Sequence, residues 1–202
     1  MNRELAVACR PRGPFAEAVI RLAAMAPLEA RVLDAVPAWL KSLAADAREF
    51  ALVLETAESP EALRRTAATA LNYLFKSLDL IPDGLEELGY IDDALVFRVA
   101  TAAVPASELG EEGGVFRRLA SDTALIEEFL GEIQPRLVAY VEKLGSAAVR
   151  GRSVDDILGD DAVRADFARE VRQWADGYQP PAFYRDEKNL VKLRSFLNAK
   201  LR

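Results

Sequence analysis

The residues of this sequence with the strongest potential for chemistry are six acids in one short stretch. Residues 79–93 read DLIPDGLEELGYIDD and contain no Lys or Arg. Four of the acids are aspartates at the two ends of the stretch, namely Asp79, Asp83, Asp92 and Asp93. If the apolar segments on either side form an antiparallel helical hairpin, the loop between them brings these four carboxylates close together.

Four converging carboxylates are compatible with two interpretations, and the first is a divalent metal site. Like charges at short range repel one another, and Mg²⁺ or Ca²⁺ would relieve that repulsion through the oxygen ligands that both ions prefer. With a water molecule on the metal, hydrolytic chemistry would become available. Against this interpretation, the loop contains no Lys, Arg or His to orient a substrate, and the chain has no phosphate-binding glycine loop.

The second interpretation is structural, and the sequence favours it. An aspartate at a helix N-terminus accepts backbone N–H bonds and suits the helix dipole, which stabilises the helix by about 1 kcal/mol per cap. We expect Asp92 to be the N-cap of the next helix, with Asp93 in its first turn. Asp79 and Asp83 would stabilise the turn around Pro82 through Asx-type bonds. These roles account for all four aspartates without a ligand, so we assign no catalytic or cofactor-binding residue.

Other reactive side chains are scarce. Histidine is absent from the 202 residues, which excludes His-based zinc sites, Ser-His-Asp triads and imidazole acid–base catalysis. The single cysteine, Cys9, cannot form an internal disulfide and has no base to activate it, which fits a reducing cytoplasm. We expect Tyr73 and Tyr90 to be packed aromatic residues with hydrogen-bonded hydroxyls. Arg98, within an apolar segment, should pair with an acid or reach solvent.

The charge balance narrows the classes of partner. The formal net charge is −6 and the pI is near 4.9, which argues against a binder of duplex nucleic acid. Residues 185–202 carry six bases, but these are scattered around a helix, which is typical of a solvated face. The longest apolar stretch without charge, residues 66–75, is half of what a membrane span needs. We therefore expect a cytoplasmic protein, with membrane contact not favoured.

The elements that must position the aspartates show helical periodicity. The segment after Ser59-Pro60-Glu61 has a helix start signal, with Ser59 as the cap. We predict a helical hairpin over about 60–104 whose arms meet through apolar residues on one face of each helix. These residues are Leu71, Leu74, Leu78, Leu95 and Val99.

The rest of the chain also follows the helical period, and nothing alternates like a strand. The apolar stripes begin at Phe15, at Val36 (with Pro37 as a first-turn proline or kink), at Ile126, at Val163 and at Leu190. The stripe from Ile126 predicts one long helix to Leu144 with a kink at Pro135. We expect an all-α bundle of about eight helices in one domain over residues 1–202. The alternative is two helical subdomains, 1–108 and 115–202, joined by a glycine-rich linker.

The loop and its flanks resemble the YkvA-like family, a bacterial family catalogued as domain of unknown function 1232. The resemblance rests on a tyrosine, an Asp-Leu-Ile-Pro-Asp run and a Gly-Tyr-Ile-Asp-Asp run at fixed spacing. The matching positions are Tyr73, Asp79, Leu80, Ile81, Pro82, Asp83, Gly89, Tyr90, Asp92 and Asp93. About 40 residues are covered, and the resemblance implies a helical hairpin but no activity.

This copy of the loop is more polar than the family's usual pattern. Ser77 and Glu86 stand where prolines are usual, and Gly84 and Glu87 replace apolar residues. Some members of the family are thought to associate with membranes through the hairpin, and these departures weaken that expectation here. Three classes of function follow. The favoured one is a non-catalytic interaction or scaffold protein with a protein partner. The alternatives are a divalent-metal-binding protein or metal-dependent hydrolase that uses the four aspartates, and a peripheral membrane protein.

Overall fold

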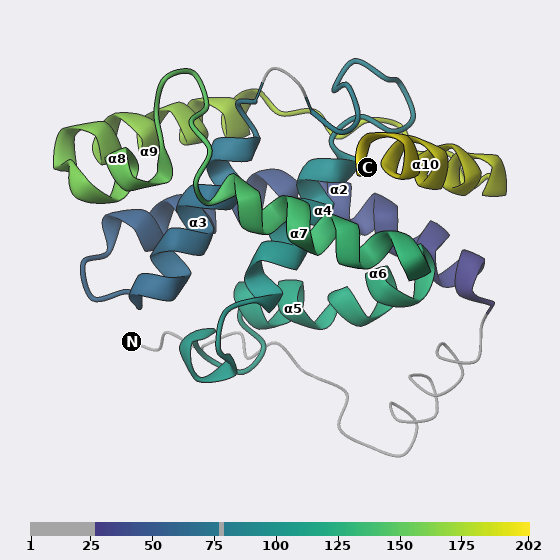
Figure 1. The fold of residues 1–202 in the computed structure, drawn as a ribbon, viewed down its shortest axis with the longest axis horizontal. Coiled ribbons are helices and arrows are strands. Elements are labelled where there is room, and N and C mark those ends of the chain that lie inside the picture. Colours follow the sequence, from purple (N-terminus) through teal and green to yellow (C-terminus); the bar gives the residue numbers. More distant parts are fainter. Residues whose placement is uncertain (1–26, 77–78) are drawn as a thin grey trace, which may run out of the picture.

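The computed structural model describes residues 27–76 and 79–202, and its described part is built from helices and their connections (Figure 1). Within these residues no strand forms, and the only β-type pairing is an isolated bridge between Val149 and Arg152. The predicted all-α fold is therefore confirmed. The apolar stripe that begins at Phe15, and the residues Cys9 and Leu78, lie outside the described residues.

The elements follow one another along the chain with short connections. They are α2 (Leu28–Glu55), α3 (Glu61–Tyr73), α4 (Ile91–Ala102), the 3₁₀ turn η1 (Ala106–Glu108), α5 (Val115–Ser121), α6 (Thr123–Leu130), the 3₁₀ turn η2 (Gly131–Ile133), α7 (Gln134–Leu144), α8 (Val154–Gly159), α9 (Asp161–Gly177) and α10 (Glu187–Lys200).

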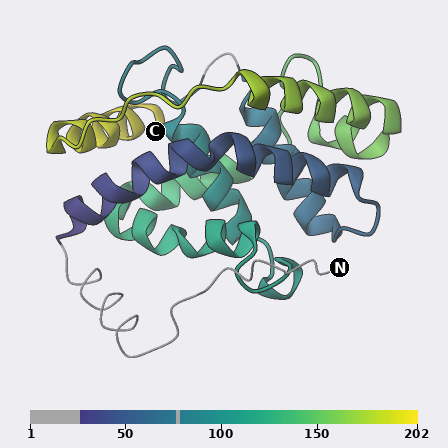
Figure 2. The ribbon, with the colours of Figure 1, turned by 180° about the vertical axis from the view of Figure 1, so that it is seen from behind.

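Helix α4 lies at the centre of the molecule. All of its residues from Ile91 to Thr101 are buried, so it must have neighbours on every side. Helix α7 passes in front of α4 in Figure 1 and α2 lies behind it, and the reverse view in Figure 2 brings α2 to the front. Helices α3 and α5 also pack against α4. The position of α4 matters for function because the two adjacent aspartates of the motif, Asp92 and Asp93, lie in its first turn.

The predicted hairpin is confirmed in its essentials. Helices α3 and α4 pack against each other, and Leu71, Leu74, Leu95 and Val99 are all buried. The start of α3 differs from the prediction, because Pro60 occupies the N-cap position and no side chain caps the helix. Ser59 is therefore not the cap. The chain enters α3 through the fixed backbone of proline instead of through a capping hydroxyl.

Two prolines differ from the expectations in part, since the first-turn position is wrong for Pro37 and the long helix around Pro135 is divided. Helix α2 begins at Leu28 and runs without a break to Glu55, so Pro37 lies well inside it and not in its first turn. The long helix predicted from Ile126 to Leu144 is divided into α6 and α7. Gly131, with a φ of 53°, ends α6, while Pro135 lies at the start of α7, where a missing N–H removes no helical bond.

Burial follows the predicted stripes across these interruptions. The stripe residues Ile126, Phe129, Ile133, Leu137, Val141 and Leu144 are all buried. Apolar residues on both sides of segment 108–114 belong to one buried cluster, and the number of domains stays a prediction. In the described ranges, no helix combines the length and the apolar character that crossing a bilayer would require.

Candidate functional site

Asp92 joins the two arms of the hairpin to the loop between them. Its carboxylate is completely buried, and Oδ2 accepts hydrogen bonds from the hydroxyl of Tyr73 at 2.7 Å and from the backbone N–H of Ile81 at 2.9 Å. The Tyr73 hydroxyl in turn accepts the N–H of Leu80 at 2.9 Å. Tyr73 ends α3, Leu80 and Ile81 belong to the loop, and Asp92 lies in α4. One carboxylate and one phenol therefore fix all three segments.

This arrangement differs from the predicted helix cap. The N-cap of α4 is Tyr90, which has a left-handed backbone with φ 63°, and its side chain makes no capping hydrogen bond. Helix α4 begins two residues earlier than an N-cap at Asp92 would require, so Asp92 is its second residue. The prediction that Asp92 is the N-cap is wrong because its carboxylate is turned to Tyr73 and Ile81. Asp93 does lie in the first turn, as predicted.

Both adjacent aspartates keep an unsatisfied oxygen. Asp92 Oδ1 and Asp93 Oδ2 are buried and have no hydrogen-bond partner among the described residues. Burial raises the pKa of Asp92, and the hydrogen bonds from Tyr73 and Ile81 offset only part of that effect. The pKa of Asp93 is raised well above its ordinary value, first by burial and then by the charges of Asp92, Asp83 and Asp79. The interior therefore favours the protonated form of Asp93.

Asp79 and Asp83 lie at the surface end of the cluster. Both line a cavity of about 390 Å³. Burial and the charges of Asp92 and Asp83 raise the pKa of Asp79 to about 7, while Lys76 lowers it. Burial and the charge of Asp92 raise the pKa of Asp83 to about 6, against a hydrogen bond with Tyr90. Neither carboxylate accepts a backbone hydrogen bond from a described residue, so the predicted Asx-type turns do not form there.

The same cavity contains three basic residues that the sequence did not indicate. Lys76 follows α3, Arg150 lies in the loop before α8, and Lys200 ends α10; all three line the cavity with Asp79 and Asp83. Arg150 and Lys200 lie far from the loop along the chain, and no sequence pattern relates them to it, whereas Lys76 lies just before Asp79. Residues 79–93 contain no base, and the fold supplies Arg150 and Lys200 from other elements.

The predicted metal ligands do not gather into one set in this structure. Asp79 and Asp83 line the cavity, whereas Asp92 and Asp93 are buried and do not line it. Across residues 27–76 and 79–202, no three His, Cys, Asp or Glu side chains are placed so that they could hold one metal ion. Binding of Mg²⁺ or Ca²⁺ by these aspartates stays a prediction.

The four aspartates all lie within a single recognisable segment of the sequence. Residues 64–98 match the DUF1232 family. Its description is "Protein of unknown function". The resemblance seen in the sequence is thereby confirmed for this segment, which runs from within α3, through the loop, to Arg98 of α4. No curated protein and no solved structure matches the chain.

The glycine of the DUF1232 motif is required by a close backbone contact. A Cβ on Gly89 would lie 2.2 Å from the carbonyl oxygen of Asp83 and 3.2 Å from that of Leu85. The amide of Gly89 donates to the Leu85 carbonyl at 2.8 Å. The loop thus folds back on itself at Gly89, where the backbone leaves no room for a side chain.

Aromatic residues from outside the DUF1232 segment cover the acidic side of the motif. Tyr90 meets Trp174 of α9 and Tyr178, with ring centroids 6.0 Å and 5.2 Å apart. Burial raises the pKa of Tyr178, and the charge of Asp93 raises it further, which places this phenol near the buried carboxylate. Its hydroxyl donates to the carbonyl of Leu40 at 3.0 Å. The expectation of a buried, hydrogen-bonded tyrosine is confirmed for Tyr73.

Arg98 closes the segment with a buried ion pair. Its side chain is fully buried, and its Nε donates to Asp122 Oδ2 at 2.9 Å while Nη1 donates to the Ala94 carbonyl at 2.9 Å. The guanidinium lies 4.5 Å from the ring centre of Trp39. The predicted pairing of Arg98 with an acid is confirmed. The carboxylate of Asp122 forms an ion pair with Arg98, and its side chain does not cap α6.

Proposed function

We propose that this chain is a non-catalytic interaction protein in which the aspartates of the DUF1232 motif build and hold a binding element. The observation that carries this proposal is that Asp92, the most central acid of the motif, uses one oxygen to tie Tyr73 and Ile81 together. A carboxylate that holds three segments in place is a structural group. These hydrogen bonds hold the loop between α3 and α4 in one position. Its outer residues, Asp79 and Asp83, line a cavity together with basic side chains.

The energetics of the tether support this assignment. Asp92 satisfies two buried donors, and leaving a buried donor unpaired costs about 1–3 kcal/mol. Loss of the carboxylate would therefore destabilise the protein by roughly 2–4 kcal/mol, a large part of a typical folding free energy. A residue with that effect on stability needs no ligand to explain its place in the motif.

A second candidate function is divalent-metal binding, and one observation favours it. Asp92 Oδ1 and Asp93 Oδ2 are buried oxygens without a partner among the described residues, and both belong to neighbouring side chains of α4. A cation that reached them would gain oxygen ligands and remove the repulsion between the acids. Asp79 and Asp83 would have to move inward to complete such a site.

Thermal unfolding of Asp92→Asn and Asp92→Ala separates these functions. Asparagine keeps an oxygen that can accept from Tyr73 and Ile81, so we expect its melting temperature to lie within a few degrees of wild type. Alanine leaves both donors unpaired, and its loss of roughly 2–4 kcal/mol corresponds to roughly 5–15 °C. Each protein is melted in EDTA, in millimolar Mg²⁺ and in millimolar Ca²⁺. We expect no dependence on either cation.

The control is Asp166→Asn, which changes an exposed aspartate of α9 that pairs with the exposed Arg169; its melting temperature should match wild type in every buffer. A cation-induced rise in wild type that Asp166→Asn retains and Asp92→Asn loses would refute the structural assignment, since a bound ion stabilises in proportion to its occupancy. Mg²⁺-dependent hydrolysis of p-nitrophenyl phosphate that disappears in Asp92→Asn would refute the non-catalytic part of the proposal.

A further inference from the structure

A second cavity, on the side of α7 that meets the end of the chain, has a different chemical character. It has a volume of about 250 Å³ and lies between the middle of α7 and the C-terminal end of α10. We call it the basic cavity. Its lining residues are Arg136, Ala139, Tyr140, Lys143, Lys200, Leu201 and Arg202. Four of these seven are cationic and none is acidic, although the whole chain carries a net charge of −6.

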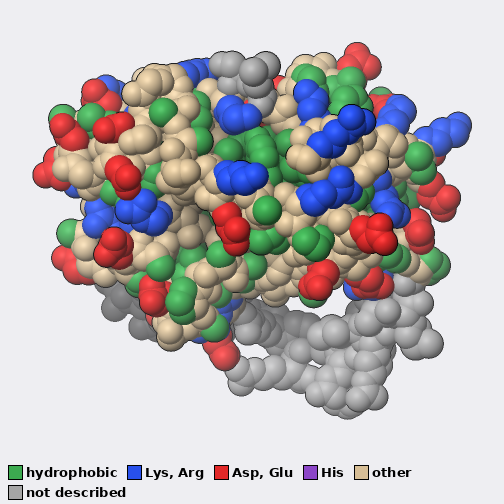
Figure 3. Space-filling model, in the orientation of Figure 1, with side chains coloured by type: hydrophobic (Ala, Val, Ile, Leu, Met, Phe, Trp, Pro, Cys, Tyr) green, Lys and Arg blue, Asp and Glu red, His purple; other side chains and the backbone are tan. Residues whose placement is uncertain are grey.

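Figure 3 shows the surrounding surface. On the face that Figure 1 presents, Lys and Arg side chains gather over α7 and α10 near the C-terminus, while acids dominate other parts of the outline. The scattered bases of residues 185–202 had indicated a solvated face. These bases are exposed as expected, and the fold also brings Lys200 and Arg202 beside Arg136 and Lys143 of α7, which forms a patch of one sign that neither helix has alone.

The cations of this cavity are not neutralised by neighbouring acids. Most arginines of the described chain make ion pairs with Asp or Glu, but within residues 27–76 and 79–202 none of the ion pairs involves Arg136, Lys143 or Lys200. Bringing four like charges into one hollow is unfavourable unless an anion joins them. Acids do line the two adjoining hollows. Asp79 lines the cavity that shares Lys200, and Glu132 lines the one that shares Arg136.

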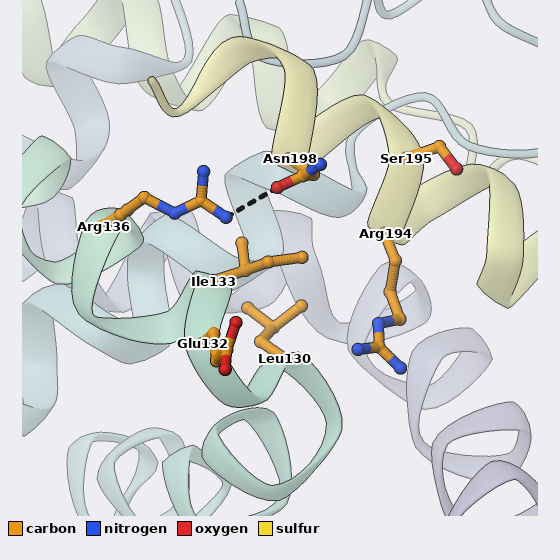
Figure 4. Close-up of a pocket in the computed structure, with 7 residues that line it drawn as sticks. All are labelled: Leu130, Glu132, Ile133, Arg136, Arg194, Ser195 and Asn198. Carbon is orange, nitrogen blue, oxygen red and sulfur yellow. Dashed lines mark hydrogen bonds between the residues drawn. The ribbon is translucent and has the colours of Figure 1, made fainter.

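Arg136 is held in position for such a contact. Its Nη1 donates to the carbonyl of Leu201 at 3.0 Å and its Nη2 donates to Asn198 Oδ1 at 2.6 Å. Figure 4 shows Arg136 reaching from α7 to Asn198 of α10, while Arg194 extends from α10 elsewhere in the adjoining hollow. Neither partner is charged, so the guanidinium keeps its full charge and has further N–H donors. A fixed planar fork of this kind suits the oxygens of a phosphate.

Tyr140 adds a neutral donor to the basic cavity. Its hydroxyl accepts a hydrogen bond from Lys76 Nζ at 3.0 Å. Because that bond uses a lone pair of the oxygen, the hydroxyl hydrogen is left to donate. Its ring packs edge-on against Tyr73, with centroids 6.1 Å apart, so the DUF1232 segment sets the place of this residue.

We propose that the basic cavity is a binding site for a phosphate-bearing anion. A phosphate monoester presents nearly two negative charges and three terminal oxygens, which matches a fork, two ammonium groups and a hydroxyl better than a carboxylate would. The volume is below the usual range of sites for drug-sized ligands, so it fits a phosphate group with a small substituent. This site goes beyond the proposed function and does not depend on the role of Asp92.

Calorimetric titration with inorganic phosphate, supported by thermal shift, tests the proposal. The variants are Lys143→Gln, Lys200→Gln and the double variant, and neither lysine makes an ion pair with an acid of the described residues that its loss would break. Wild type should bind phosphate and melt at a higher temperature in its presence. Each single variant should bind about tenfold more weakly and the double variant should show no measurable binding.

The matched control is Lys188→Gln, which removes an exposed lysine from the other end of α10 and should leave binding unchanged. Sodium chloride at equal ionic strength separates a site from general screening. A double variant with Lys143→Arg and Lys200→Arg keeps both charges and must retain binding, which guards against a mere loss of folding.

A further experiment distinguishes a soluble phosphate ligand from the phosphate of a lipid headgroup. Vesicles of phosphatidylcholine with and without phosphatidic acid are sedimented with each protein. Binding of inorganic phosphate that the glutamine double variant loses supports a soluble ligand. Binding only to phosphatidic acid vesicles, again lost in that variant, supports a lipid headgroup as the source. The proposal is overturned by any of three results: no binding of either probe, equal binding by wild type and the glutamine double variant, or an effect that chloride reproduces.

Discussion

Replacing Asp79 by asparagine removes a carboxyl group whose ionisation the folded protein resists. Burial and the charges of Asp92 and Asp83 raise its pKa to about 7 from an ordinary value of 3.8, and Lys76 acts in the opposite direction. Because the unfolded chain loses this proton at lower pH than the folded chain, ionisation favours unfolding. The favourable contribution of Asp79 to the free energy of unfolding is fully present below about pH 4, and it is lost as the pH rises to about 7. Asparagine never ionises, so it avoids the loss.

The magnitude follows from the same shift. A difference of about 3 pKa units would correspond to about 4 kcal/mol at 1.36 kcal/mol per unit. Asp79 is only half-buried and lines an open cavity, so solvent screens its charge. We therefore expect Asp79→Asn to be more stable than wild type by roughly 1–2 kcal/mol at pH 8 and equal to it at pH 4.

Urea unfolding at each pH from 4 to 8, in EDTA and at low salt, measures this difference. The decisive quantity is the stability of Asp79→Asn minus that of wild type, since the other aspartates titrate in both proteins. Asp166→Asn, an exposed site, should give a difference near zero at every pH. A difference that does not change with pH, or a variant less stable than wild type at pH 8, would contradict the reasoning. The second result would mean that Arg150 and Lys200 stabilise the ionised form.

Two further predictions concern positions where the structure supplies a matched control. Gly89→Ala should strongly destabilise the protein in denaturant unfolding, because its Cβ would meet the Asp83 carbonyl. Gly84→Ala, with open space around it, should be nearly neutral. Equal effects of the two substitutions on the free energy of unfolding would refute the close-contact argument. Asp122→Ala should cost roughly 2–4 kcal/mol because it leaves the buried Arg98 cation unpaired, while Asp176→Ala, which breaks an exposed pair with Arg48, should cost less than about 1 kcal/mol. A small effect of Asp122→Ala would show that Arg98 gains little from the pair.

The helical fold could be predicted because burial repeats with the helical period. The stripe from Ile126 to Leu144 names six residues that are all buried, although the helix is broken at Gly131. The break was missed because a short 3₁₀ turn keeps the same face inward while the backbone departs from the helix. Periodicity reports on which face is buried, and it carries little information on where a helix stops.

The role of Asp92 could not be predicted from the sequence. Its type and position next to an apolar helix are what an N-cap requires, and the sequence offered no reason to choose Tyr73 as its partner. That choice depends on the hairpin, which brings the last residue of α3 against the first turn of α4. Tyr90 takes the cap position with a left-handed backbone, which is uncommon for a residue with a Cβ and gave no sequence signal.

Charge patterning predicted the exposure of the bases in residues 185–202, all six of which are exposed, but it did not predict their neighbours. Residues 185–202 were interpreted as one solvated helix because their bases lie on several faces. In the fold those faces meet different neighbours. Lys192 pairs with Glu87, Arg185 pairs with Asp34, and Lys200 joins Arg136. The surroundings of each base are set by contacts between distant segments, which single-sequence reasoning cannot supply.

These observations together separate what the DUF1232 segment contributes from what the rest of the chain contributes. Residues 64–98 contain the tether of Tyr73 and Asp92, the acids of the loop and Lys76, while the other two bases that line the cavity of Asp79, Arg150 and Lys200, come from residues after Arg98. Lys200 lines both the cavity of Asp79 and the basic cavity, so one α10 residue connects the two charged surfaces. A hairpin fixed by internal hydrogen bonds can keep its geometry while the helices around it change. The choice of ligand is therefore expected to reside in α7 and α10, and the motif acts as the rigid support on which they are placed.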